Sequence, residues 1–352
     1  MKTRTRRPLV LITALIAGAL ALSGCAGSGA GEKVEVNNGK TKVNLILNWT
    51  PLADHAPYFL AKANGLYDDA GLDVNIEFGK GSADSAQRVA TGQSDIAVSD
   101  TGSVVAASGM GAELLVVGML FDKGPQAIWT TNASGITEPA DLVGKKVGVP
   151  NGDTQKVLFP ALAKANDFDA SKVDFVNIAP TAKYGALSSN QVDAILDFTT
   201  GQPFVEKAVG ADNAVVIPWA DHGVNLYGNA LVTTNKYAEV NADVLKKFLK
   251  ATYTAWQETM EDPDAAIATM KKAVPEVDVP TFTANLTLVL DLFKSTHYAE
   301  NGIGYMNEDR MCETVETVQE YVPVESKPEC TDLYTNDYLT KVELPASMET
   351  TG

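Results

Sequence analysis

The chain from residue 43 onward alternates between segments with the apolar spacing of a strand and segments with that of a helix. Apolar and polar residues in alternation predict half-buried strands, whereas apolar residues three and four positions apart predict helices. One series of strands ends near residue 120, and a second begins after Ile136. The predicted strands are residues 43–49, 72–78, 95–98 and 114–120 in the first series and 145–149, 173–178, 191–198 and 215–219 in the second.

Helices are predicted between these strands and dominate the end of the chain, after a last strand at residues 230–234. The predicted helices are residues 57–63, 82–92, 153–165, 241–260 and 281–294. Strands that alternate with helices form parallel-rich sheets covered by helices on both faces. We therefore expect an α/β protein with two lobes. A ligand would bind beyond the carboxyl ends of the strands, and the lobes would close around it.

Residues 1–24 have the pattern of a secretory signal peptide. A basic head from Lys2 to Arg7 precedes an apolar run from Leu9 to Leu22, which is shorter than the ~20 residues of a membrane-spanning helix. The sequence Leu22-Ser23-Gly24-Cys25 resembles the lipobox of bacterial lipoproteins. This resemblance implies a lipid anchor on Cys25, with a chance cysteine after a plain signal peptide as the alternative. Residues 25–42 would then be the lipidated cysteine and a flexible linker.

The charge of the chain limits its partners. Four of the 28 basic residues and none of the 44 acidic residues lie in the signal, so the exported part would have a net charge near −20. Such a surface repels nucleic acid, and we expect no nucleic-acid partner. About 310 residues follow the linker, a length that suits two lobes.

Two further cysteines, Cys312 and Cys330, remain after the lipobox. A pair in an exported chain predicts a disulfide, here closing a loop of about 18 residues, although two free thiols are the alternative. The three histidines, His55, His222 and His297, are not at ligand spacing. We therefore expect no metal site and no cofactor.

Several motifs resemble those of the thiamine pyrimidine-precursor family (NMT1-like), which contains binding proteins and synthases. They occur in the same order, and the resemblance covers nearly all of residues 43–339. Related binding proteins for nitrate, sulfonates and taurine share part of the pattern. The motifs include Asn48-Trp49-Thr50-Pro51 with His55, Gly92-Gln93-Ser94-Asp95-Ile96-Ala97, and Tyr334-Thr335-Asn336-Asp337-Tyr338-Leu339.

The resemblance implies a two-lobe periplasmic binding protein of the second structural type. Lobe I would comprise residues 43–130 and 227–352, with a helical C-terminal part, and lobe II residues 131–226. The implied function is that of a monomeric, lipid-anchored receptor on the outer face of the cell membrane. It would deliver a small nitrogen heterocycle, such as a thiamine pyrimidine precursor, to the transmembrane subunits of an ABC permease. A Gram-positive surface and a periplasm both remain open.

Two alternatives come from the same relatives. A receptor for a small anion would need cationic groups in the cleft. The exported chain has only Arg88 and Arg310, neither at a strand end, so a buried lysine facing the ligand would favour the anion. The family also contains an enzyme that consumes its own histidine and pyridoxal phosphate and has a cysteine-rich iron-binding run. Residues 225–230 at the matching place contain no cysteine, so we expect no enzyme activity.

Candidate ligand-binding residues lie where predicted strands end. Trp49 offers a flat ring for stacking, His55 offers ring nitrogens, and carboxylates would accept hydrogen bonds from an aminopyrimidine. Core packing, helix capping and solvated loop acids are the alternatives for these residue types. The remaining candidates are Ser82, Asp84, Asp100, Thr101, Asn151, Gly152, Asp153, Thr154, Asp197, Phe198, Thr199, Tyr227 and Asn229.

Overall fold

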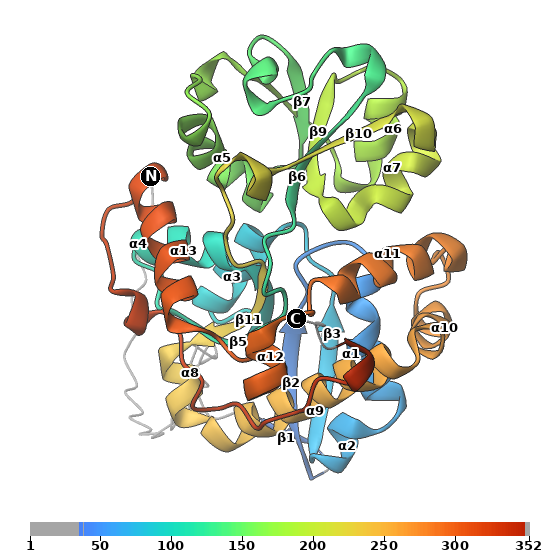
Figure 1. Cartoon of the computed structure of the whole chain (residues 1–352). Helices are drawn as coiled ribbons and strands as arrows, with labels where there is room; N and C mark the ends of the chain where they lie inside the picture. Colours follow the sequence, from blue (N-terminus) through green and yellow to red (C-terminus); the bar gives the residue numbers. More distant parts are fainter. Residues whose placement is uncertain (1–34, 38, 349–352) are drawn as a thin grey trace, which may run out of the picture.

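The computed structural model describes residues 35–37 and 39–348, which form two α/β lobes (Figure 1). The predicted signal peptide, Cys25 and most of the predicted linker lie outside the described residues. In the part of the chain that is described, no helix is both long enough and apolar enough to cross a membrane.

The first sheet has the order β3-β2-β4-β11-β5. The short strand β1 pairs antiparallel with the first two residues of β2. Strand β2 is parallel to β3 and β4, whereas β11 is antiparallel to both of its neighbours, β4 and β5. The strands are β1 (Val36–Asn37), β2 (Lys40–Ile46), β3 (Leu72–Glu77), β4 (Ile96–Asp100), β5 (Leu114–Met119) and β11 (Asn229–Thr234).

The second sheet repeats this plan in the order β8-β7-β9-β6-β10. Strand β7 is parallel to β8 and β9, and β6 is inserted antiparallel between β9 and β10. Each sheet is therefore mostly parallel, and its inserted antiparallel strand comes directly after the chain has crossed from the other lobe. The strands are β6 (Gln126–Thr131), β7 (Lys146–Val149), β8 (Asp174–Asn177), β9 (Ala194–Phe198) and β10 (Ala214–Pro218).

Strand β6 corrects the lobe boundary expected from the sequence. It pairs with β9 and β10, so the chain enters lobe II between Met119 and Gln126 and not after residue 130. All six residues of β6 are buried, so the strand has no alternation of apolar and polar positions to reveal it. The chain returns to lobe I between Pro218 and Asn229.

The helices flank both sheets and form the C-terminal part of lobe I (Figure 1). Two of them begin at the cleft with an aspartate whose side chain accepts a hydrogen bond from the first turn: Asp100 for α4 and Asp153 for α5. The helices are α1 (Ala56–Ala63), α2 (Leu66–Asp69), α3 (Ser82–Ala90), α4 (Thr101–Gly109), α5 (Thr154–Ala165), α6 (Lys183–Ser188), α7 (Gln202–Val209), α8 (Asn235–Val240), α9 (Ala242–Glu261), α10 (Pro263–Ala273), α11 (Val279–Asp291), α12 (Thr296–Asn301) and α13 (Glu308–Tyr321).

The two lobes touch across the cleft at several points. The main-chain oxygen of Gly152 accepts a hydrogen bond from the Ala83 amide at 3.3 Å, and the hydroxyls of Ser103 and Thr154 are 2.7 Å apart. Gly81, with φ +150°, makes this approach possible, because a Cβ there would lie 2.2 Å from the Gly152 oxygen. The structure is therefore the closed form of the two lobes.

Asn285 on α11 also links the lobes through its side-chain amide. Its Oδ1 accepts a hydrogen bond from the Ala53 amide of lobe I at 3.2 Å, and its Nδ2 donates to the Thr200 carbonyl of lobe II at 2.6 Å. Asn285 is 3 % exposed, so water cannot readily replace it as the hydrogen-bond partner of these two main-chain groups.

Cys312 on α13 and Cys330 form a disulfide with a Cα–Cα distance of 5.1 Å. The segment that follows Cys330 adds to the edge of the first sheet, where the Val116 amide donates to the Leu333 carbonyl at 2.8 Å. The disulfide therefore joins this edge segment to α13, which itself packs against α4 and α5.

We expect the double variant Cys312→Ser/Cys330→Ser to lower the free energy of unfolding by about 3 kcal/mol, because an 18-residue loop is no longer closed in the unfolded chain. Urea denaturation with and without dithiothreitol measures the effect. The reductant should shift the midpoint of the natural chain and leave that of the double variant unchanged. Equal midpoints for the natural chain in both conditions would contradict this expectation.

We expect Asn285→Ala to favour the open form, because closure would leave the Ala53 amide and the Thr200 carbonyl without partners. A loss of about 2 kcal/mol from the closed form weakens ligand affinity by roughly 30-fold although Asn285 does not line the pocket. Small-angle X-ray scattering and calorimetric titration measure both effects. The control is Asn64→Ala, which removes an exposed amide bonded to Glu258. Equal affinities in the two variants would rule out this role.

Candidate functional site

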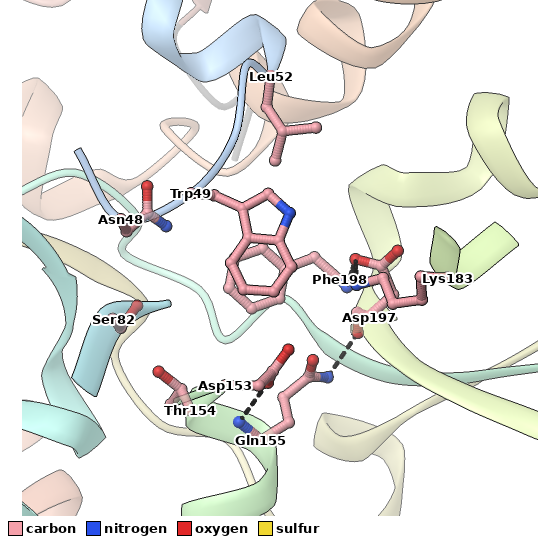
Figure 2. Close-up of a pocket in the computed structure, with 10 residues that line it drawn as sticks. All are labelled: Asn48, Trp49, Leu52, Ser82, Asp153, Thr154, Gln155, Lys183, Asp197 and Phe198. Carbon is pink, nitrogen blue, oxygen red and sulfur yellow. Dashed lines mark hydrogen bonds and ion pairs between the residues drawn. The ribbon is translucent and has the colours of Figure 1, made fainter. Parts of the chain in front are cut away.

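A pocket lies between the lobes and is lined by side chains from both (Figure 2). Its free volume is about 40 Å³, which holds only a few water molecules. A heterocycle would therefore enter only when the lobes separate. Lobe I contributes Asn48, Trp49, Leu52 and Ser82, and lobe II contributes Asp153, Thr154, Gln155, Lys183, Asp197 and Phe198.

Six of the residues predicted from the sequence line this pocket. They lie at or just beyond the carboxyl ends of β2, β7 and β9 or begin the helices after β3 and β7, as expected for an open α/β sheet. The six are Trp49, Ser82, Asp153, Thr154, Asp197 and Phe198.

Lys183 is the most consequential lining residue that the sequence analysis missed. It is 3 % exposed, and its Nζ lies 3.2 Å from Asp197 Oδ1 and 5.0 Å from the centre of the Trp49 ring. The ion pair and the cation–π contact together hold the ammonium at the side of the pocket. Its position six residues after the end of β8 was the available signal, because it follows a strand end as the predicted residues do.

Two carboxylates balance and exceed the charge of Lys183. Asp197 Oδ1 also accepts a hydrogen bond from the Phe198 amide at 2.8 Å. The pKa of Asp153 is raised to about 6, mainly by burial; the charge of Lys183 and the Gln155 amide oppose the shift, and the charge of Asp197 adds to it. With both acids ionised, the lining carries one excess negative charge, so the pocket favours a ligand that donates hydrogen bonds.

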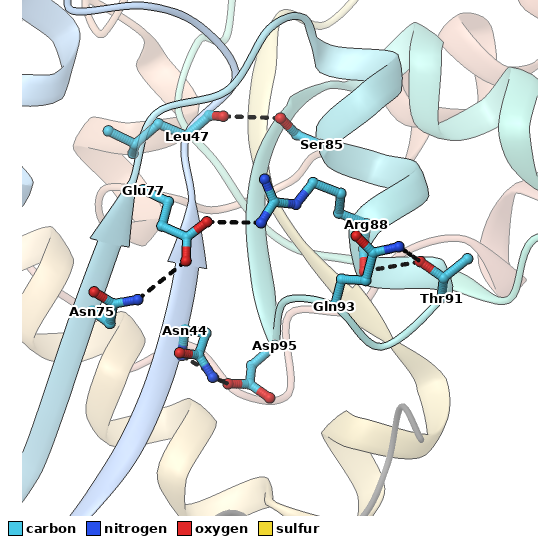
Figure 3. Close-up of polar contacts among 9 residues, drawn as sticks. All are labelled: Asn44, Leu47, Asn75, Glu77, Ser85, Arg88, Thr91, Gln93 and Asp95. Atoms are coloured by element: carbon cyan, nitrogen blue, oxygen red, sulfur yellow. Dashed lines mark hydrogen bonds and ion pairs between the residues drawn. The ribbon is translucent and has the colours of Figure 1, made fainter. Parts of the chain in front are cut away.

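Neither Arg88 nor Arg310 lines the pocket. The Arg88 guanidinium lies 2.7 Å from Glu77 beside the lobe I sheet (Figure 3). Arg310 donates from Nε to the Asp122 carbonyl at 2.8 Å and stands 5.0 Å from the centre of the Tyr227 ring. The pocket lining therefore contains no guanidinium for a planar anion.

His55 is fully buried and does not line the pocket, contrary to the expectation that its ring faces the ligand. Its Nδ1 accepts a hydrogen bond from the Leu52 amide at 3.2 Å, and its Nε2 lies 3.0 Å from Asn48 Oδ1. Burial lowers the pKa of His55. The histidine thus contacts a lining residue, Asn48, and not the cavity.

Asp100 and Thr101 lie behind the pocket, at the junction of the lobes. Asp100 accepts hydrogen bonds from the Gly102 amide at 2.9 Å and from Gln126 Nε2 at 2.8 Å, and burial raises its pKa to about 7. Thr101 donates to the Gly228 carbonyl at 2.7 Å. These contacts hold the start of α4 against the two segments that connect the lobes, at Gln126 and at Gly228.

The other predicted residues also lie outside the lining. Asp84 and Asn151 are exposed, and Gly152 makes the contact between the lobes described above. The Thr199 amide donates to the Pro125 carbonyl at 2.7 Å. Tyr227 Oη accepts from the Asn307 amide at 3.0 Å, which makes it a packing residue.

Asn229 is fully buried, and its side-chain amide has no hydrogen-bond partner among the described residues. Within residues 35–37 and 39–348, no group of three or more His, Cys, Asp or Glu residues is arranged to hold a metal ion.

Three curated relatives align with most of the chain. The formylaminopyrimidine-binding protein of Halalkalibacterium halodurans is 25% identical over 272 residues, which are 76% of this chain and 80% of the relative. The riboflavin-binding protein RibY of Chloroflexus aurantiacus is 22% identical over 307 residues, 85% of this chain and 86% of the relative. The 4-amino-5-hydroxymethyl-2-methylpyrimidine phosphate synthase of Legionella pneumophila is 26% identical, covering 73% of this chain and 81% of the enzyme.

The fold also matches that of solved periplasmic binding proteins. The aliphatic sulphonate binding protein SsuA of Escherichia coli superposes with a TM-score of 0.61 and 17% identity, covering 86% of this chain and 94% of SsuA. At this identity the likeness establishes the two-lobe α/β fold alone. The family model described as NMT1/THI5 like matches residues 52–266, well over half of the chain. The chain therefore belongs to the NMT1/THI5-like family.

Proposed function

We propose that this protein is the solute receptor of an ABC importer and that it captures a flat nitrogen heterocycle of the aminopyrimidine kind. The observation that carries the proposal is the pocket itself, in which the Trp49 ring stands beside an excess of carboxylate (Figure 2). An aromatic face stacks on a flat ring, and carboxylate oxygens accept hydrogen bonds from an exocyclic amine. The names of two relatives, which bind formylaminopyrimidine and riboflavin, support this class of ligand.

We also propose that the protein acts on the outer face of the cell membrane. The lipobox-like sequence at Cys25 supports a lipid anchor, and the basic head with its apolar run supports export. A monomeric receptor on a flexible tether would release its ligand to the transmembrane subunits of the permease.

We further propose that the protein binds its ligand and does not catalyse a reaction on it, although some relatives are named as synthases. His55, around which this chain resembles the enzyme branch of the family, is fully buried with both ring nitrogens engaged. Residues 225–230 contain no cysteine to hold iron.

A receptor for a small anion is the second candidate, and buried Lys183 is the observation that favours it. From the sequence, a buried lysine facing the ligand is the expected sign of an anion site. Asp197 lies within 3.2 Å of its ammonium, however, and Asp153 adds a further carboxylate to the lining. An anion would therefore meet a net negative lining, and the heterocycle remains the better fit.

We expect hydroxymethylpyrimidine or formylaminopyrimidine to raise the melting temperature of the domain that begins after Cys25. A micromolar binder at millimolar concentration stabilises the folded form by about 4 kcal/mol. Thermal unfolding with these ligands and with thiamine, riboflavin, taurine and nitrate tests the proposal. Trp49→Ala should abolish the shift, whereas Met110→Ala, which removes an exposed side chain of lobe I, should retain it. A shift with taurine or nitrate alone would contradict the proposal.

We expect the affinity for a neutral aminopyrimidine to fall as the pH is lowered through about 6, because protonation of Asp153 removes its charge. An anionic ligand would bind more tightly over the same pH range. Calorimetric titration between pH 5 and 8 measures the direction. Asp153→Asn should flatten the profile, whereas Asp84→Asn, at an exposed acid outside the lining, should not. Tighter pyrimidine binding at pH 5 would contradict this assignment.

A further inference from the structure

We infer that His55 is a positioning residue that fixes the Asn48 side chain as a hydrogen-bond donor to the ligand. The pocket would then select heterocycles that present an acceptor atom to lobe I. The selectivity rests on the proposed function, whereas the state of His55 can be measured without any ligand.

The partner of Nδ1 decides the tautomer of the imidazole. Nδ1 is 3.2 Å from the main-chain nitrogen of Leu52, which can only donate. Nδ1 must therefore be the unprotonated, accepting nitrogen. The ring proton then resides on Nε2, which faces Asn48 Oδ1 at 3.0 Å.

The surroundings of His55 favour this neutral form. The side chain is 0 % exposed and packs against the Phe78 ring, with 5.8 Å between ring centres. The nearest acid is Asp54, whose Oδ1 lies 3.9 Å from Nε2 and which is itself buried. An imidazolium would direct an Nδ1 proton at the Leu52 amide hydrogen, so protonation would break the local structure of residues 52–55.

The Nε2 proton in turn decides the orientation of the Asn48 amide. An asparagine amide can be turned over with little change of shape, and only its partners distinguish oxygen from nitrogen. Because Nε2 donates, the atom facing it must be the oxygen, and the NH₂ group must point the other way. Asn48 lines the pocket, and Figure 2 shows its nitrogen on the side toward Ser82, with the oxygen on the opposite side.

The two lobes therefore offer complementary groups to one ligand. Lobe I presents the Asn48 NH₂ as a donor beside the Trp49 ring, and lobe II presents the Asp153 carboxylate as an acceptor. A ring nitrogen next to an amino group supplies both partners on one edge. A site built to donate a hydrogen bond rejects an analogue that lacks the acceptor, because the donor is then buried without a partner.

The first test measures the tautomer in the unliganded protein. Long-range ¹H–¹⁵N correlation of imidazole-labelled protein distinguishes an Nε2–H ring from an Nδ1–H ring or a cation. His222→Gln and His297→Gln assign the His55 signals by elimination. We expect a neutral Nε2–H ring at pH 7. An Nδ1–H ring, or a cation at pH 7, would overturn the inference whatever ligand the protein binds.

The second test measures the selectivity that the tautomer imposes. Hydroxymethylpyrimidine is compared with its two analogues in which one ring nitrogen is replaced by CH. We expect the natural protein to bind one of these analogues about tenfold or more weakly than the parent. His55→Phe should reduce that preference to about twofold, and His55→Gln should retain part of it, because its amide can still donate to Asn48.

The preference ratio separates positioning from a merely structural role. A general loosening of the fold would weaken parent and analogue equally, and that result would overturn the inference. His297→Phe, at a half-buried position outside the lining, is the control and should leave the ratio unchanged. If the natural protein binds neither pyrimidine nor analogue, the proposed function fails for this ligand, while the tautomer result stands alone.

Discussion

Enclosure of charge in a closing cleft is the constraint on which the rest of the structure depends. Closure removes Lys183, Asp197 and Asp153 from most of their water, and buried charges are tolerated only with partners. The Lys183–Asp197 pair meets this requirement within lobe II. Asp153 has the Gln155 amide at 2.9 Å and a raised pKa, and Asp197 Oδ2 has no hydrogen-bond partner among the described residues. A donor-rich ligand would complete that environment, which couples closure of the lobes to the chemistry of the ligand.

Several contacts between the lobes lie outside the pocket and are neutral. Asn285 joins main-chain groups of both lobes, and the Gly81 backbone allows the Gly152 carbonyl to approach closely. Neutral contacts of this kind stabilise the closed form by the same amount for every ligand. Selectivity must therefore come from the few side chains that line the pocket, and affinity from the sum of both sets.

The sequence predicted the parts of the molecule that follow from periodicity. All predicted strands from residue 43 onward exist, and α5 begins after its capping residue Asp153, whereas α3 begins at Ser82 with Gly81 as its N-cap and no side-chain cap. Strand β6 was missed because burial of every residue removes alternation. Lys183 is not predicted, because the sequence does not show which of its lysines becomes buried beside a strand end. The prediction that His55 contacts the ligand is wrong, since spacing along the chain does not distinguish a residue that lines a pocket from one that packs behind it.

The division of roles between the lobes suggests why one fold accommodates different ligands. Lobe I offers a ring and an amide whose orientation is set by a buried neutral histidine, whereas all three charged lining residues come from lobe II. A change of charge in lobe II would alter the preferred ligand without disturbing the platform in lobe I. The lobe II residues Asp153, Lys183 and Asp197 are therefore where this chain and relatives with other named ligands should differ in their chemistry, while Trp49 supplies the stacking surface that any flat ring can use.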